Sequence, residues 1–361
     1  LGANGQNYSP NAISTTTYYR RLVTGGVCPQ STSNVTTITV EPVISGNTIT
    51  GDQSFCGSGN PGVLTATGVL AGGNGSYAYQ WQESTDGGNT WAVAAGTSTN
   101  ATYDPPLLTQ TTVYRRGVSS GTCFDNSNNV TITVYPVITN NNISADQASC
   151  GAFVPATIIG TTPNGGTGSY TYSWESSTNG GATWLPIGGA TSANYSPGSV
   201  AVTTQFRRIV TSLPCSNTST AVTITITPPI TVNTISSSQT FCVSGTPTTL
   251  TGPVPTGGNG FFTYQWQSST DGFNWSPIGG ATNQSYSPGV ITTTTYFQRV
   301  ATSGSCTLAS NTVTITIVPA IVSNTISTDQ IFCSSGDPAI LMGSAPSGGT
   351  GSYNYQWYSS T

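Results

Sequence analysis

Residues 77–91 read YAYQWQESTDGGNTW, and this stretch predicts the fold. Its aromatic residues Tyr77, Tyr79 and Trp81 alternate with small or polar residues, which is the period-two pattern of a strand with one buried face. The Asp-Gly-Gly that follows predicts a tight turn leading into a second strand at Trp91. The stretch therefore indicates a β-hairpin with an aromatic inner face.

The same hairpin recurs along the chain, and cysteines recur with it. The tryptophans of the four triplets are Trp81, Trp174, Trp266 and Trp357, and the two cysteine series are Cys56, Cys150, Cys242, Cys333 and Cys28, Cys123, Cys215, Cys306. Successive members of each series lie roughly 91 to 95 residues apart. This period is longer than that of ordinary solenoid repeats, and it fits a domain that buries its own core.

The period divides the chain into three complete modules between two halves. The expected units are a C-terminal half-module at 1–42, module 1 at 43–137, module 2 at 138–229, module 3 at 230–320, and an N-terminal half-module at 321–361. Because both ends fall inside a repeat, we expect the native polypeptide to be longer in both directions. In the alternative, the C-terminal half of one copy completes the N-terminal half of the next.

Each module reads as a series of short strands. In module 1, alternating apolar residues predict further strands at 62–69, 111–118 and 130–134, and no stretch has the 3.6-residue period of a helix. About seven strands, one mid-module tryptophan and a cysteine near each end predict an all-β fold, namely immunoglobulin-like β-sandwich domains in an extended tandem array. The short proline-containing links between modules predict limited bending.

Composition excludes several classes of function. Charged residues make up 5% of the chain, the net charge is −4, and histidine and lysine are absent. Nucleic-acid binding is not expected because there is no basic surface. The usual general base, the commonest metal ligand and the Schiff-base amine are all missing. We therefore expect no enzyme activity, no cofactor and no metal site, and no long apolar run predicts a membrane span.

Two cysteines per period indicate structural disulfides formed in an oxidising compartment. We favour pairing within modules, and this assigns Cys56–Cys123, Cys150–Cys215 and Cys242–Cys306, with Cys28 and Cys333 bound to modules outside this segment. The alternative pairs sequence neighbours across each junction: Cys28–Cys56, Cys123–Cys150, Cys215–Cys242 and Cys306–Cys333. A strand of about eight residues, ~27 Å long, separates each of those cysteines from the junction and argues against the alternative.

One arginine position recurs in every module, at Arg21, Arg116, Arg208 and Arg299. Strand alternation places Arg116 on the inner face with Tyr114 and Val118. A buried guanidinium needs partners, and no acidic residue recurs in all modules to provide one. We therefore expect stacking on Trp or Tyr and hydrogen bonds to backbone carbonyls. Our interpretation is a structural role for these arginines and for the four tryptophans. Ligand binding by the arginines and a sugar platform made of the aromatic triplets are the alternatives.

Residues 84–91 (STDGGNTW) fit the Asp-box pattern S-x-D-x-G-x-T-W. Residues 177–184 (STNGGATW) repeat it with Asn179 in place of aspartate, and module 3 has a shorter version at Asp271. In this pattern a side-chain oxygen accepts hydrogen bonds from the backbone N–H groups of a turn. We interpret the motif as a hairpin turn rather than as a catalytic feature.

Three phrases of module 1 together carry a family resemblance: GGNGSYAYQWQESTDGGNTW (72–91), ATYDPPLLTQTTVYRRGVSSGTC (101–123) and SNNVTITVYP (127–136). The chain resembles the Ig-like repeats of very large secreted proteins of Bacteroidota-type bacteria, including gliding-motility-associated adhesins and type IX-secreted repeat proteins. The resemblance implies an extracellular, cell-surface or filamentous location. We expect a structural stalk, filament or adhesin whose partners are further copies of the same repeat. The alternative is a carbohydrate-binding array with surface glycans as partners.

Overall fold

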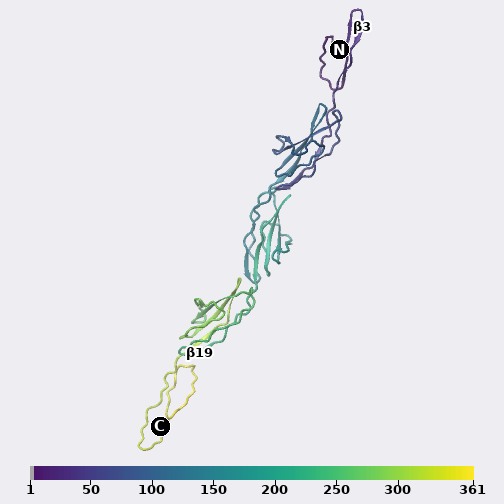
Figure 1. Cartoon of the computed structure of the whole chain (residues 1–361). Helices are drawn as coiled ribbons and strands as arrows, with labels where there is room; N and C mark the ends of the chain where they lie inside the picture. Colours follow the sequence, from purple (N-terminus) through teal and green to yellow (C-terminus); the bar gives the residue numbers. More distant parts are fainter. Residues whose placement is uncertain (1–3) are drawn as a thin grey trace.

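The computed structural model describes residues 4–361, and the regular structure in that range consists entirely of β-strands. The modules follow one another in an extended row, with the two termini at opposite ends (Figure 1). The predicted all-β array of immunoglobulin-like sandwiches is confirmed. None of the described residues forms a helix long and apolar enough to cross a membrane.

The strands repeat from module to module. Module 1 contains β5 (Ile49–Thr50), β6 (Gln53–Cys56), β7 (Thr65–Ala66), β8 (Ala78–Ser84), β9 (Ala92–Val93), β10 (Thr112–Ser120), β11 (Cys123–Asn126) and β12 (Val130–Tyr135). Module 2 contains β13 (Gln147–Cys150), β14 (Thr171–Ser177), β15 (Leu185–Pro186), β16 (Thr204–Ser212), β17 (Cys215–Thr218) and β18 (Val222–Thr227). Module 3 contains β19 (Gln239–Cys242), β20 (Thr263–Ser269), β21 (Ser276–Pro277), β22 (Thr295–Ser303), β23 (Cys306–Ala309) and β24 (Val313–Val318). The half-module at the start contains β1 (Thr17–Tyr19), β2 (Leu22–Gly25), β3 (Cys28–Thr32) and β4 (Thr36–Ile38).

The main sheet of module 1 has the order β6-β12-β10-β8-β9, with β11 paired to β10, and modules 2 and 3 repeat this order. The first strand runs parallel to the last one, so that Cys56 lies beside Tyr135 at the end where the chain leaves the module. The other pairs in this sheet are antiparallel. The opposite layer is held by the β5–β7 pair and by isolated bridges such as Leu64–Tyr103.

The core lies between these layers, around the mid-module tryptophan. Trp81 is fully buried, and its ring stacks on Tyr103 with 5.6 Å between centroids. Its indole N–H donates to the carbonyl of Asn100 at 2.9 Å. Trp174 and Trp266 are buried in the same way, so the prediction that the mid-module tryptophans form the core is confirmed for the complete modules, whereas the other two aromatic residues of each triplet are half-buried. The burial of the tryptophans removes the largest aromatic ring of each complete triplet from any sugar-binding platform.

The two half-modules differ from the complete modules. Trp357 is 52% exposed, whereas its three equivalents are 0% exposed, and Arg21 is exposed as well. In a complete module the tryptophan strand pairs with the arginine strand, as β8 pairs with β10. Each half-module has only one of these two strands, and so neither residue is covered. For these two residues the inward position stays a prediction, because the strand that would cover each of them is not among the described residues.

Candidate functional site: the module junction

The most informative site is the junction between modules, because a disulfide crosses it. Cys56 of module 1 bonds to Cys215 of module 2, with 5.0 Å between their Cα atoms. Cys150 of module 2 bonds to Cys306 of module 3, with 4.8 Å between Cα atoms. Each bond spans more than 150 residues of sequence and joins one module to the next.

Both pairings expected from the sequence are wrong. In each complete module one cysteine ends the first strand of the main sheet (β6, β13 or β19), and we call it the strand-end cysteine. The other begins the strand after β10 or its equivalents, and we call it the hairpin-tip cysteine. The strand-end Cys150 lies beside Thr227, at the exit of module 2. The hairpin-tip Cys215 lies beside Pro136, at the entry of the same module, with 3.4 Å between its Sγ and the carbonyl oxygen.

The two cysteines of one module therefore lie at opposite ends of the sandwich and cannot bond to each other. The neighbour pairing fails for the same reason, since it would join the entry of one module to the exit of the next. The parallel pairing of the first strand with the last places the strand-end cysteine at the exit. Sequence spacing alone carries no sign of that strand direction.

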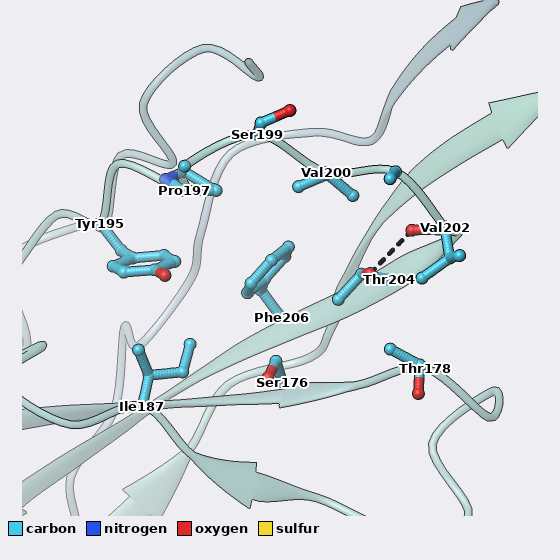
Figure 2. A pocket seen from close by; sticks show the side chains of 12 residues that line it. Ser176, Thr178, Ile187, Tyr195, Pro197, Ser199, Val200, Val202, Thr204 and Phe206 are labelled. Carbon is cyan, nitrogen blue, oxygen red and sulfur yellow. Dashed lines mark hydrogen bonds between the residues drawn. The ribbon is translucent and has the colours of Figure 1, made fainter. Parts of the chain in front are cut away.

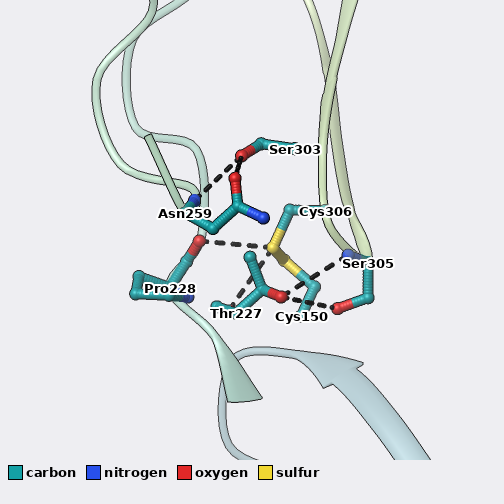
Figure 3. The surroundings of a disulfide bond; sticks show 7 residues. All are labelled: Cys150, Thr227, Pro228, Asn259, Ser303, Ser305 and Cys306. Carbon is teal, nitrogen blue, oxygen red and sulfur yellow. Dashed lines mark hydrogen bonds between the residues drawn. A yellow bond between two sulfur atoms is a disulfide. The ribbon is translucent and has the colours of Figure 1, made fainter. Parts of the chain in front are cut away.

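The sulfur atoms lie against the backbone of the linker. The Sγ of Cys306 lies 3.3 Å from the carbonyl oxygen of Pro228 and 3.5 Å from that of Thr227. The hydroxyl groups of Ser305 and Thr227 lie 3.2 Å apart, which ties the hairpin tip to the linker (Figure 3). A small apolar cluster surrounds the other disulfide: Cys56 and Tyr135 of module 1 pack against Ile138, Val210 and Cys215 of module 2. The junction is thus both covalent and packed.

A second recurring arrangement lies inside each module, around the arginine. Arg116 is 1% exposed. Its Nε donates to Oδ1 of Asn47 at 3.1 Å, and its Nη1 donates to the carbonyl of Ala101 at 2.8 Å. In return, Nδ2 of Asn47 donates to the carbonyl of Arg116 at 3.2 Å. The guanidinium carbon lies 5.3 Å from the centroid of the Tyr79 ring.

Modules 2 and 3 repeat this arrangement. Arg208 donates to Asn141 at 2.9 Å and Arg299 donates to Asn233 at 3.1 Å, each through Nε to the amide oxygen. Burial lowers the pKa of all three arginines from the ordinary value, yet a guanidinium stays charged at neutral pH. The predicted stacking on tyrosine and bonding to carbonyls is confirmed. We did not predict the asparagine that accepts from each arginine, although the sequence repeats it. It is the first residue of the phrases NTI, NNI, NTI and NTI, which begin at residues 47, 141, 233 and 324.

The outer face of the sheet carries a tryptophan–arginine stack. The guanidinium of Arg115 lies 4.0 Å from the Trp91 ring, and that of Arg207 lies 4.1 Å from the Trp184 ring. Arg207 also forms an ion pair with Glu175 at 2.7 Å. The arginine therefore covers one face of each of these two surface tryptophans.

The Asp-box turn is a capping device, as predicted. The Asp86 carboxylate accepts hydrogen bonds from the backbone N–H groups of Asn89 and Thr90 at 3.0 and 2.9 Å, and from the Ser84 hydroxyl at 2.6 Å. The bonds from Ser84 and Thr90 hold the pKa of Asp86 well below its usual range. In module 2 the amide oxygen of Asn179 accepts from the N–H of Thr183 at 3.0 Å.

Surface cavities offer little chemistry. A shallow cavity of about 350 Å³ lies in module 2, between the segment 197–202 and the strands that carry Ser176 and Phe206 (Figure 2). Tyr195 is the only titratable residue in its lining. Among residues 4–361, no cluster of three His, Cys, Asp or Glu side chains is placed to hold a metal ion.

Comparison with solved structures returns tandem immunoglobulin domains. Titin domains A168–A170 match at 11% identity and TM-score 0.35, covering 76% of this chain and 97% of that one. Sidekick-1 immunoglobulin domains 1–5 match at 12% identity and TM-score 0.32, covering 87% of this chain and 68% of that one. The N-terminal four Ig domains of Dscam1 isoform 6.9 match at 10% identity and TM-score 0.28, covering 84% of this chain and 80% of that one.

Comparison with curated proteins found no match. A family model described as "Domain of unknown function (DUF8696)" matches the chain four times, at residues 1–42, 45–136, 139–228 and 231–319. These four matches cover most of the sequence, and so the chain belongs to the DUF8696 family, in tandem copies.

Proposed function

We propose that this chain is a structural, non-enzymatic repeat protein that forms an extracellular stalk, filament or adhesin at a bacterial cell surface. The observation that supports this most directly is the pair of disulfides that tie successive modules together. Disulfides persist in oxidising compartments such as the cell exterior. The nearly uncharged surface, with charged residues at 5% of the chain, suits a spacer better than an ionic binding protein.

The connectivity of the two disulfides makes the array hard to extend. Three segments of chain each connect the Cys56–Cys215 bond to the Cys150–Cys306 bond, and they share any load between the two bonds. These segments are 56–150, 150–215 and 215–306. Under tension the shortest segment limits the length, and that segment has roughly 65 residues, or about 230 Å when fully extended. Without disulfides, the same region would extend over roughly 250 residues, or about 880 Å. We infer that the disulfides protect a load-bearing fibre from unravelling.

Single-molecule stretching of the chain, with and without a reducing agent, tests this role. The expected result is a limit of about 230 Å between residues 56 and 306 in the oxidised protein and about 880 Å after reduction. Equal extensions in the two conditions would refute the load-bearing role. The location is tested separately with antibodies against the chain on intact cells of the source organism. Labelling that appears only after permeabilisation would refute a surface location.

The glycan-binding alternative has no observation that favours it. The tryptophans of the complete triplets are buried, and Trp91 and Trp184 are covered on one face by arginine. An array of surface glycans is the direct control. We expect no retention of the chain on it.

A further inference from the structure

The two cysteines of each junction disulfide differ in their exposure to solvent. At the junction of modules 2 and 3, Cys306 is 1% exposed, whereas Cys150 is exposed. At the junction of modules 1 and 2, Cys215 is 0% exposed, whereas Cys56 is half-buried. In both bonds the hairpin-tip cysteine is therefore the covered partner, and the strand-end cysteine is the more accessible one.

The linker and a group of apolar side chains cover the hairpin-tip sulfur of module 3. The Sγ of Cys306 lies 3.3 Å from the carbonyl oxygen of Pro228 and 3.5 Å from that of Thr227 (Figure 3). Ile230 and Ala301 pack against Cys306 in a small buried cluster. The carbonyl oxygens carry partial negative charge, so they repel an incoming thiolate, and the apolar side chains exclude it from the sulfur.

The hairpin-tip sulfur of module 2 has the same cover. The Sγ of Cys215 lies 3.4 Å from the carbonyl oxygen of Pro136. Ile138 and Val210 pack against Cys215, as Ile230 and its neighbour do in module 3. Two independent junctions therefore shield the same member of the disulfide, and the shielding belongs to the repeat and not to one module.

Two effects act in opposite directions on the opening of such a bond. A disulfide opens when a thiolate attacks one of its sulfur atoms and expels the other as a thiolate. Attack at the strand-end sulfur expels the buried sulfur, which is unfavourable because the new charge forms among apolar side chains and carbonyl oxygens. That cost slows the exchange without preventing it, whereas a covered sulfur cannot be reached until the module opens. Accessibility therefore decides which sulfur is attacked.

We propose that the strand-end sulfurs of Cys56 and Cys150 are the sites at which a small external thiol of the glutathione type reacts with the junction disulfides. In reduction, its thiolate bonds to the Sγ of Cys150, the bond between Cys150 and Cys306 breaks, and Cys306 leaves as a thiolate that takes a proton from water. In the reverse reaction, the Cys306 thiolate attacks a Cys150–glutathione disulfide and expels glutathione. This inference rests on the proposed function, because it concerns the disulfides that carry the load.

The same asymmetry links closure of a junction to folding of the next module. The exposed strand-end cysteine can hold glutathione as a mixed disulfide, whereas the hairpin-tip cysteine that displaces it belongs to the following module. The hairpin-tip sulfur reaches its partner only where the following module has folded against the linker. Each junction disulfide therefore forms as the last step in the docking of two folded modules.

The test uses the folded chain with both junction disulfides intact. Iodoacetamide first alkylates the cysteines outside these bonds, namely Cys28, Cys123, Cys242 and Cys333. Reduced glutathione is then added, the reaction is stopped with acid at early times, and the adducts are located by peptide mass spectrometry. We expect about tenfold more glutathione on Cys150 than on Cys306, and a bias of the same direction towards Cys56 over Cys215.

Unfolding and two matched variants serve as controls. In guanidinium chloride both sulfurs of each bond are exposed, so glutathione should divide about equally between them. Ile230→Ala removes cover from Cys306 alone and should raise the share of glutathione there, while the other junction stays unchanged. Ile138→Ala should raise the share on Cys215 alone. Circular dichroism checks that each variant keeps its β-sandwiches, and the unmodified chain carries the main test.

Several outcomes would overturn the proposal. These are glutathione mainly on Cys306 or Cys215 in the folded chain, an equal division between the two sulfurs, a bias that persists in guanidinium chloride, and bonds that open only after unfolding. The stretching experiment asks whether the two bonds limit extension, and its result does not depend on which sulfur reacts. A chain that resists extension but carries glutathione on its hairpin-tip cysteines would refute this inference and leave the proposed load-bearing function standing.

Discussion

Asn47 holds Arg116 at both ends: its amide oxygen accepts from the guanidinium at 3.1 Å, and its amide nitrogen donates to the arginine carbonyl at 3.2 Å. The two residues are 69 positions apart and come from opposite layers of the sandwich. The contact thus bridges the layers of each module around a buried charge. A buried charge that loses a partner costs far more than an exposed one.

The same contact in module 2 gives the first prediction. Replacing Asn141 by alanine removes an acceptor of the Arg208 guanidinium and leaves that buried charge under-bonded. We expect a loss of about 2–3 kcal/mol of stability in that module. Hydrogen exchange of peptides from β16 measures it locally. The variant Asn142→Ala is the matched control, because the Asn142 side chain is exposed. Equal hydrogen-exchange protection of β16 in the two variants would contradict a stabilising role for the Asn141–Arg208 hydrogen bond.

The junction disulfides give the second prediction. Cys215→Ser opens a loop of 159 residues, which the chain-entropy model values at about 5 kcal/mol. We expect a lower thermal midpoint for modules 1 and 2 in calorimetry. Cys123→Ser changes the equivalent position of module 1 and leaves both disulfides of the described residues intact, so the midpoint of this segment should equal that of the unmodified segment. Identical curves for the two variants would show that Cys215 is not bonded as described.

A backbone position beside the strand-end cysteine gives the third prediction. Gly57 and Gly151 have φ angles of 73° and 74°, but Val243 occupies the same position in module 3 with φ 67°. A β-branched residue is strained in the left-handed region, by about 1–2 kcal/mol. Glycine removes that strain but adds chain entropy to the unfolded state. We therefore expect Val243→Gly to stabilise module 3 by about 1 kcal/mol.

Denaturant unfolding followed by hydrogen exchange in β19 and β24 measures this gain. The reverse change, Gly151→Val, is the control. It introduces the same strain into module 2 and brings a Cβ within 3.4 Å of the Pro229 ring. We expect it to destabilise that module. A stabilising effect of Gly151→Val would contradict the role of the left-handed turn.

The sequence predicted the parts of this fold that depend on local periodicity. Alternation along residues 77–81 was enough to place Trp81 in the core, and parity along the next long strand was enough to turn Arg116 inward. Two features depend on relations between distant strands and were not predictable in this way. The disulfide partners follow from the parallel pairing of β6 with β12, and the Asn47–Arg116 contact joins segments that only the folded sandwich brings together.

The Asp-box turns give the last prediction, a difference in pH response between modules. Hydrogen bonds from Ser84 and Thr90 hold the pKa of Asp86 well below its ordinary value of 3.8, whereas the equivalent residue of module 2 is the uncharged Asn179. A lowered pKa in the folded state means that the carboxylate stabilises the turn fully above the ordinary value. That stabilisation is lost as the pH falls from about 4 through the folded pKa.

Amide chemical shifts measured during an acid titration report this directly. The N–H of Thr90 should stay unchanged through pH 4 and move only well below it, while the N–H of Thr183 should not respond at all. Asp86→Asn converts the turn of module 1 to the type found in module 2, so it should keep the turn and abolish the response of Thr90. A Thr90 titration centred near 3.8 would mean that the hydrogen bonds to the Asp86 carboxylate do not favour its charged form, and the turn would then owe its shape to the glycines alone.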